Sequence, residues 1–171
     1  MKIAVKDANV FIDLEAMGLL DLWFQLGHHT LTSGFVVGEL EDGRHTNALA
    51  CITAGLVEVA VIEAGEWLAF EELRQECEPM GMSVGDVSVL FLANRENAML
   101  LTGDKILRRH AVVQSIEVHG TLWIMDQLVE AGVLDATLAA ARLEALMELV
   151  GAERRYLPRA ECAARIRRWR G

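Results

Sequence analysis

The sequence of 171 residues predicts an α/β fold, and two observations indicate it. Five short apolar runs with strand character alternate with segments of helical character, which is the order of βαβ units in a mostly parallel sheet. The run at residues 98–102 is apolar almost throughout, as expected of a strand that such a sheet buries on both faces. With 53% apolar residues, the chain can build one sizeable core.

Each expected strand is a run of apolar and β-branched residues that is bounded by polar residues or by glycine. Because right-handed crossovers join parallel strands, these five should form one sheet flanked by helices. They are expected at residues 2–6, 30–33, 57–62, 98–102 and 116–118.

The first predicted helix has Asp13 as its N-cap, an apolar stripe through residue 26, and Gly27 at its end. A second opens after Gly34. Further helices are expected at residues 48–54, 65–77, 84–95, 105–113, 121–131, 137–150 and 159–169, with Pro79 and Gly81 separating two of them. We expect a main domain at residues 1–135, and a C-terminal helical extension at 136–171 that packs on it.

The net charge of −9 is unevenly distributed. Residues 153–171 hold seven arginines and two glutamates, a net charge of +5, which leaves −14 for residues 1–152. A basic end on an acidic body suits contacts with phosphate or with a partner, and it equally suits a solvated amphipathic helix. The absence of a membrane-length apolar run and of a signal-peptide pattern favours a cytoplasmic protein.

The cysteines and histidines do not indicate a zinc site or a disulfide framework. Cys51, Cys77 and Cys162 are widely spaced and form no CxxC pair, so three buried or half-buried thiols are expected. His28 and His29 are adjacent and would point in different directions on a helix or a strand.

Four carboxylates are predicted to meet at one edge of the sheet. Asp7 closes the first strand, Glu39 follows the second, and Asp104 follows the fourth. Asp86 lies in the first turn of the helix before the fourth strand, behind Ser83 as its cap. Ligands of open α/β sheets bind beyond the carboxyl ends of the strands, so this edge is the expected site.

Clustered carboxylates raise one another's pKa, and a hard divalent cation compensates them. An all-oxygen set favours Mg²⁺ or Mn²⁺ over zinc. Such an ion can activate a water molecule and orient a phosphodiester. Each acid taken singly also fits a helix cap or a solvated surface group, and Asp86 could simply favour its helix dipole. Their joint placement favours the metal site.

Five stretches resemble the motifs of PIN domains, in the same order. The first two are VKDANVFIDL at residues 5–14, with D-x-N after an apolar strand, and TSGFVVGEL at 32–40, with a glutamate on the following helix. The next are SVGDVSVLFLA at 83–93 and LLTGDKILR at 100–108, with T-x-D after an apolar strand. VHGTL at 118–122 is similar to a stretch of VapC-like toxins.

The resemblance covers roughly residues 1–135 and implies a Rossmann-like three-layer sandwich with a five-stranded, mostly parallel sheet. It also implies an Mg²⁺- or Mn²⁺-dependent endoribonuclease that acts on RNA, often the toxin of a type II toxin–antitoxin pair. A cognate antitoxin and a homodimer are the partners expected from it. Where many of these toxins carry a further acid, this chain has Lys105 to Arg108, so the number of metal ions stays open.

On this hypothesis Asp7, Asp86 and Asp104 supply most metal contacts, and Glu39 binds the ion or orients the attacking water. Hydrogen bonds from neighbouring side chains would hold these carboxylates or the metal waters. Asn9, Ser33 and Thr102 are expected in that supporting role, and Lys105 and Arg108 are expected to steady the phosphate.

Two other functions compete with this hypothesis. A PIN-fold module with little or no catalytic activity could bind RNA or a partner protein, and the complete set of acids argues against it. Receiver or phosphatase domains also gather aspartates at strand ends, but they place a second acid directly beside the first-strand aspartate or two residues after it. Ala8 and Asn9 occupy those positions in this chain.

Overall fold

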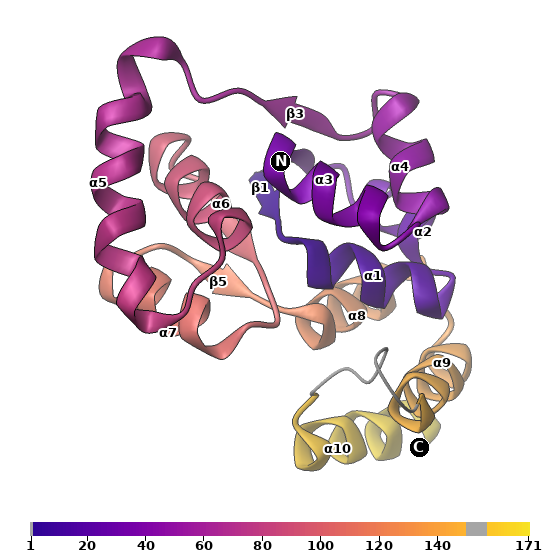
Figure 1. Ribbon diagram of the computed structural model, residues 1–171. Helices are drawn as coiled ribbons and strands as arrows, with labels where there is room; N and C mark the ends of the chain where they lie inside the picture. Colours follow the sequence, from indigo (N-terminus) through magenta and orange to yellow (C-terminus); the bar gives the residue numbers. More distant parts are fainter. Residues whose placement is uncertain (1, 150–156) are drawn as a thin grey trace.

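The computed structural model describes residues 2–149 and 157–171 and has the predicted α/β class (Figure 1). Strands and helices alternate along most of the chain, and the last three elements are helices. The elements are β1 (Ile3–Lys6), α1 (Ala8–Met17), α2 (Leu20–Phe24), β2 (His29–Ser33), α3 (Gly34–Asp42), α4 (Thr46–Thr53), β3 (Glu58–Ala60), η1 (Ala64–Glu66), α5 (Trp67–Cys77), η2 (Glu78–Met80), α6 (Val84–Arg95), β4 (Met99–Leu101), α7 (Lys105–Val113), β5 (Val118–His119), α8 (Thr121–Glu130), α9 (Ala136–Glu148) and α10 (Arg159–Arg170).

The five strands form one parallel sheet in the order β3-β2-β1-β4-β5. Val5 of the central strand pairs with Leu31 on one side and with Leu100 on the other. From β1 the chain moves outward to β2 and β3, and then returns to the opposite side of β1 for β4 and β5. The strand order therefore reverses between β1 and β4, and open parallel sheets bind ligands at the carboxyl end of such a point.

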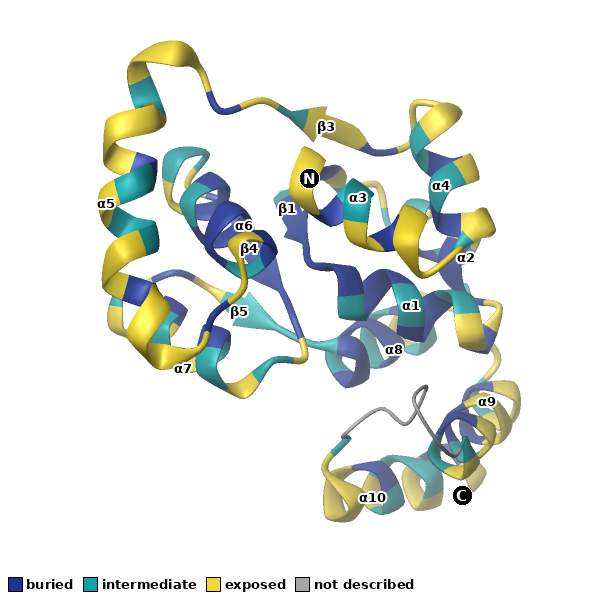
Figure 2. Ribbon diagram, in the orientation of Figure 1, coloured by how far each residue is buried: buried dark blue, intermediate teal, exposed yellow. Residues whose placement is uncertain are grey.

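Helices cover both faces of the sheet. Right-handed crossovers in opposite directions place α1, α2 and α4 on one side and α5, α6 and α7 on the other (Figure 1). Helix α6 packs against β1, β2 and β4 and is largely buried, whereas most of α5 faces solvent (Figure 2). The core thus lies on the two faces of β1 and β4, the strands that carry Asp7 and Asp104 at their ends.

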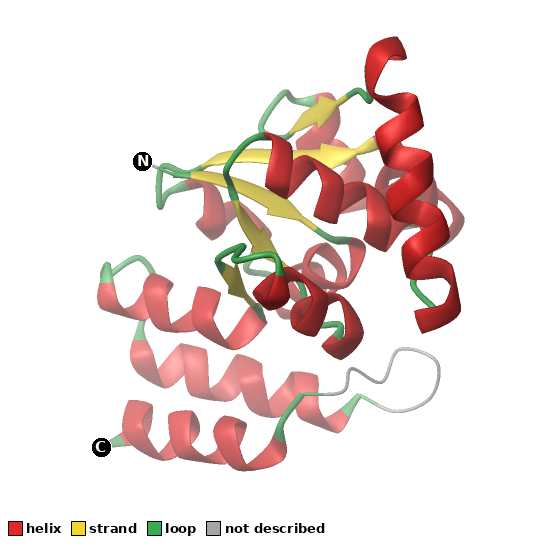
Figure 3. Ribbon diagram, turned by 90° about the vertical axis from the view of Figure 1, so that its left-hand side faces the viewer, coloured by secondary structure: helices red, strands yellow, loops and turns green. Residues whose placement is uncertain are grey.

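The C-terminal helices α9 and α10 lie side by side and run antiparallel (Figure 3). Helix α9 also packs on α1 and α8, and Arg165 of α10 donates to Asp126 of α8 at 2.9 Å. Several of the C-terminal arginines are therefore paired with acids of neighbouring helices: Arg168 also contacts Asp126 of α8, and Arg170 contacts Glu144 of α9. Arg154, Arg155 and the end of the predicted 137–150 helix lie outside the described residues.

The prediction for the first helix was wrong in its start and its length. The helix begins at Ala8, because Asp7 adopts an extended backbone and its carboxylate accepts a hydrogen bond from the Ala8 amide. Gly18, at φ 65°, ends it in the left-handed conformation. Asp13 does not cap the helix, and its buried carboxylate accepts a hydrogen bond from Thr121 Oγ1 at 2.7 Å. The apolar stripe continues into the separate short helix α2.

The other elements match their predicted positions with small shifts. Strand β3 is shorter than predicted, and β5 begins two residues later. The three cysteines are buried and free, as expected. Trp23 and Trp169 belong to the core, whereas Trp67 is 47% exposed. Across residues 2–149 and 157–171, no helix combines the length and the apolar character needed to cross a membrane.

Replacing Leu100 with alanine should lower the free energy of unfolding by about 2–5 kcal/mol. Leu100 is fully buried in β4, where the smaller side chain leaves a cavity. Leu68→Ala on α5 is the matched control, because Leu68 is 73% exposed and its loss should change stability by no more than about 0.5 kcal/mol. Urea denaturation measures both values. Equal losses in the two variants would contradict the buried position of β4 within the sheet.

Candidate active site

Asp7 lies at the point where the strand order reverses, directly after β1. Its Oδ1 accepts a hydrogen bond from the Ala8 amide at 2.7 Å, and its Oδ2 accepts one from Thr102 Oγ1 at 2.7 Å. The Asn9 side-chain amide also donates to Oδ2, at 2.5 Å. The Asp7 amide donates to the Leu101 carbonyl at 3.0 Å, which ties the end of β1 to the end of β4. The carboxylate is thereby fixed in place and is only 3% exposed.

Asp104 follows β4 and forms the other half of this edge. Its Oδ1 caps α7 by accepting hydrogen bonds from the Ile106 and Leu107 amides, both at 2.8 Å. The Asp104 amide donates to Thr102 Oγ1 at 3.0 Å. Thr102 therefore bonds to both the Asp7 carboxylate and the Asp104 backbone. Asn9 adds a second link, since its Oδ1 accepts a hydrogen bond from the Gly103 amide at 2.8 Å.

Asp86 lies in the first turn of α6, the helix that precedes β4. Its Oδ2 accepts a hydrogen bond from the Ser83 amide at 2.8 Å, and the Asp86 amide donates to Ser83 Oγ at 3.0 Å. This reciprocal pair is a capping box. The side chain is half-buried. Ser83 thus has the capping role that its place in the sequence predicts.

Glu39 differs from the three aspartates because it has no capping role. It lies within α3, and among the described residues its carboxylate accepts no hydrogen bond. Its Oε1 reaches the start of α6, where a Cβ on residue 85 would come within 2.1 Å of it. Gly85 is thus the residue that leaves room for the Glu39 carboxylate beside Asp86.

The four carboxylates influence one another electrostatically. Burial raises the pKa of Asp7 to about 7, and the charges of Asp86 and Glu39 contribute to this rise against the lowering effect of the Thr102 hydrogen bond. The pKa of Glu39 is raised by partial burial and by Asp86. Burial raises the pKa of Asp86, and the charge of Asp104 adds to the shift. Asp7, Glu39 and Asp86 therefore each lie close enough to another acid for its charge to disfavour their ionised form.

Three helix N-termini face this cluster and offset part of the repulsion. Asp7, Asp86 and Asp104 belong to the first turns or caps of α1, α6 and α7, where amide groups and the helix dipole favour negative charge. These contacts give each aspartate a structural role. They give none to Glu39, which is exposed and whose carboxylate has no hydrogen bond or ion pair among the described residues.

The other five predicted site residues lie in three different settings. Asn9 and Thr102 contact the Asp7 carboxylate directly. Ser33 instead caps α3 and shares a 2.6 Å hydrogen bond with Ser88 Oγ, which in turn donates to the Gly85 carbonyl. Lys105 is exposed at the start of α7, and Arg108 donates to the Thr102 carbonyl at 3.1 Å.

The chemistry of this donor set suits a divalent cation such as Mg²⁺ or Mn²⁺. All four groups are oxygen donors, at least three have pKa values raised by burial and by one another, and a bound cation would remove that penalty. The side chains are not in a coordinating arrangement, however. Within the described chain, no three histidine, cysteine, aspartate or glutamate side chains are placed to hold a metal ion.

Three features of this region were not predicted. Ser88 and Gly85 support the α6 edge of the site, and only their proximity to Asp86 in the sequence could have indicated them. Lys6, next to Asp7, is fully buried, and its ammonium lies 4.4 Å from the ring centre of Trp23 and 5.0 Å from that of Phe11. Burial lowers the pKa of Lys6 well below its ordinary value.

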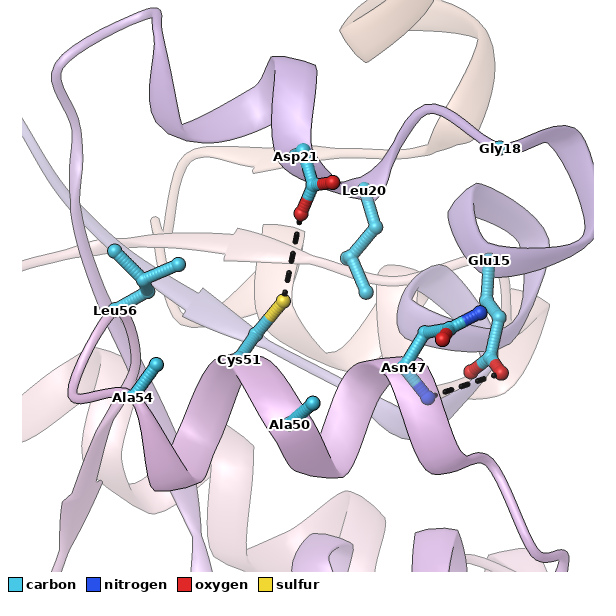
Figure 4. A pocket seen from close by; sticks show the side chains of 9 residues that line it. All are labelled: Glu15, Gly18, Leu20, Asp21, Asn47, Ala50, Cys51, Ala54 and Leu56. Carbon is cyan, nitrogen blue, oxygen red and sulfur yellow. Dashed lines mark hydrogen bonds between the residues drawn. The ribbon is translucent and has the colours of Figure 1, made fainter.

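A separate cavity of about 440 Å³ lies among α1, α2 and α4 (Figure 4). Glu15, Asp21 and Cys51 line it, and the Cys51 thiol points toward the Asp21 carboxylate at 3.9 Å. None of the four carboxylates at the sheet edge lines this cavity. Burial raises the pKa of Cys51, with a further contribution from Asp21, so its thiol is a poor nucleophile. The sheet edge is thus the better candidate for catalysis.

Comparisons with known proteins give one family match. A family model described as PIN domain matches residues 3–170, a range that contains all four carboxylates. The crystal structure of VapBC2 from Rickettsia felis bound to a DNA fragment from their promoter contains a similar chain, with 22% identity and a TM-score of 0.48. That similarity covers 69% of this chain and 98% of the other. A search of the curated proteins finds no match.

Without metal, the protein should lose stability as the pH rises from about 4 to about 7, and Asp7→Asn should remove part of this loss. The Asp7 pKa is raised from 3.8 to about 7 on folding. Over that range the unfolded chain has released the proton and the folded chain still holds it, so raising the pH favours unfolding. The contribution of Asp7 is at most about 4 kcal/mol.

Urea denaturation in EDTA at pH 4.5 and pH 8 measures this difference. Asp42→Asn, at the exposed end of α3, is the matched control and should keep the pH dependence of the unmodified protein. An Asp7→Asn variant that loses as much stability as the unmodified protein would contradict the burial and the coupling assigned to Asp7.

Proposed function

The chain belongs to the PIN-domain family, and on that premise we propose that it is a metal-dependent endoribonuclease of the toxin type. The proposed substrate is RNA, and the proposed reaction is hydrolysis of a phosphodiester bond. The proposed active site is the sheet edge that carries Asp7, Glu39, Asp86 and Asp104. Mg²⁺ or Mn²⁺ is the proposed cofactor.

The position of Glu39 is the observation that carries this proposal. Glu39 is exposed and accepts no hydrogen bond among the described residues, and its pKa is raised by partial burial and by the charge of Asp86. A divalent cation would offset the repulsion between Glu39 and the neighbouring aspartates.

The four carboxylates would hold the ion after some turning of their side chains. A bound Mg²⁺ or Mn²⁺ supplies charge for a phosphate oxygen and lowers the pKa of a water molecule. Thr102 and Asn9 orient the Asp7 carboxylate, and they link it to the backbone of Asp104 and Gly103. Arg108 and Lys105 lie next to this edge and bring positive charge for the RNA backbone.

A binding module without catalytic activity is the second candidate. Two observations favour it: three of the acids already serve as helix caps or first-turn acids, and the described residues hold no preformed metal arrangement. Such a module would bind RNA or a protein through the same edge, without cleavage. Under this alternative no cation would offset the repulsion that raises the pKa values of Asp7, Glu39 and Asp86.

The partners expected from the family resemblance, a cognate antitoxin and a second copy of the chain, stay predictions. Exposed apolar side chains near β3 and at the start of α5, including Val61, Trp67 and Leu68, are compatible with a protein partner. They do not distinguish an antitoxin from a homodimer.

Purified protein should cleave a mixed RNA pool in Mg²⁺ or Mn²⁺ and should not cleave it in EDTA. Asp104→Asn should reduce the rate by more than about 100-fold, because the variant loses one charge of the metal-binding set while its amide oxygen can still cap α7. Gel analysis of labelled RNA measures the rate.

Asp42→Asn removes the same charge from an exposed position on α3 and should cleave like the unmodified protein. Mass spectrometry must first show that no antitoxin has been co-purified. If the folded, antitoxin-free protein leaves RNA intact in both metals, the nuclease proposal is wrong and the binding module is favoured.

Replacing Thr102 with valine should slow cleavage by about 10–100-fold, a typical effect of losing a group that orients a metal ligand. Valine keeps the shape but cannot donate to Asp7 or accept from the Asp104 amide. Thr102→Ser keeps the hydroxyl and should restore most of the rate. Circular dichroism checks that both variants fold. A valine variant with full activity would show that the hydroxyl does not orient Asp7 for the reaction.

A further inference from the structure

A cavity of about 240 Å³ begins at Thr102 and Gly103, the residues between β4 and Asp104, and none of the four carboxylates lines it. Its walls come from three parts of the chain that are distant in sequence: Thr102 and Gly103 after β4, residues 119–123 at the start of α8, and Leu157 and Pro158 before α10. Thr102 contributes to this wall and also holds Asp7. The C-terminal extension therefore completes a cavity at the edge of the proposed active site.

One wall presents a pair of stacked rings. His119 and Trp123 lie face to face, with ring centres 4.0 Å apart and an angle of 12° between the planes. The His119 ring is fixed by a 2.9 Å contact with Glu117, which is itself held by Lys2 at 2.9 Å. Both rings line the cavity and are only partly buried. Aromatic surfaces of this kind stack with nucleobases in proteins that bind single-stranded nucleic acids.

The cavity also offers positive charge for the phosphate of a nucleotide. Arg108 reaches the cavity past Gly120, where a Cβ would lie 3.3 Å from its Nη1. Its guanidinium donates to a neutral acceptor, the Thr102 carbonyl, so that bond leaves its charge available. Arg165 enters from α10 and is oriented by Asp126 at 2.8 Å. Among the described residues that line the cavity, Glu161 is the one acid, and it lies 3.5 Å from Arg165.

The size of the cavity limits what it can hold. At about 240 Å³ it is smaller than the roughly 300–1,000 Å³ of sites for drug-sized ligands, so it has room for one base and not for a longer stretch of RNA. We propose that it is a nucleotide subsite, in which one base of the RNA strand stacks on the outer face of the His119–Trp123 pair and Arg108 binds its phosphate. This inference rests on the proposed nuclease function. It adds that the C-terminal extension forms part of the wall of this subsite through Leu157, Pro158 and Arg165.

Titration with adenosine 5′-monophosphate in EDTA tests the subsite without cleavage. Tryptophan fluorescence should be quenched at lower concentrations of the nucleotide than of adenosine or of inorganic phosphate, because base and phosphate bind together. The quenching should disappear in Trp123→Phe. It should persist in Trp67→Phe, the matched control, since Trp67 is exposed on α5 and does not line this cavity.

Two further variants separate the two contacts, with equilibrium dialysis of labelled nucleotide as the readout. His119→Ala should weaken nucleotide binding by about tenfold through loss of the stacked wall. Arg108→Gln should reduce nucleotide affinity to that of adenosine, while the glutamine amide can still donate to the Thr102 carbonyl.

The two proposals can fail separately. Nucleotide binding without RNA cleavage would keep the subsite and reject the nuclease. RNA cleavage without any nucleotide binding at millimolar concentration would reject the subsite alone. Quenching that depends on Trp67 and not on Trp123 would also overturn the subsite.

Discussion

The repulsion among four carboxylates at one edge of the sheet is the constraint on which the rest of the site depends. Asp7 is almost completely buried, and its pKa is raised to about 7 by desolvation and by its acidic neighbours. A fold that only needed helix caps could place them apart. This fold gathers them where the strand order reverses between β1 and β4, the position at which parallel sheets bind ligands.

The same residues stabilise the fold and prepare the site. Asp7, Asp86 and Asp104 satisfy amide groups at the starts of α1, α6 and α7, so three helix N-termini converge on the cluster. Thr102 and Asn9 then tie the ends of β1 and β4 together through side chains. Beside this centre, His119 and Trp123 add an aromatic wall, and Arg108 of α7 and Arg165 of α10 add positive charge. The negative net charge of the chain is therefore compatible with RNA binding, because positive charge is concentrated beside the acids.

Local sequence signals predicted the strand ends and most helix boundaries. Asp7, Asp86 and Asp104 could be placed because a strand end or a capping pattern marks each one. The first helix was misplaced because Asp7 and Asp13 are both good caps, and only the tertiary contact of Asp13 with Thr121 decides between them. The Ser33–Ser88 hydrogen bond and the approach of Glu39 to Gly85 join segments about fifty residues apart. No local pattern in the sequence specifies such contacts.

The central claim is that the carboxylates bind a divalent cation, and Glu39 offers its sharpest test because it caps no helix. Calorimetric titration of the metal-free protein with Mn²⁺ should show saturable binding. Glu39→Gln should weaken it by at least about tenfold, whereas Glu41→Gln, two residues further along α3 and exposed, should leave it unchanged. Equal Mn²⁺ affinity in all three proteins, or no binding in any of them, would contradict the claim.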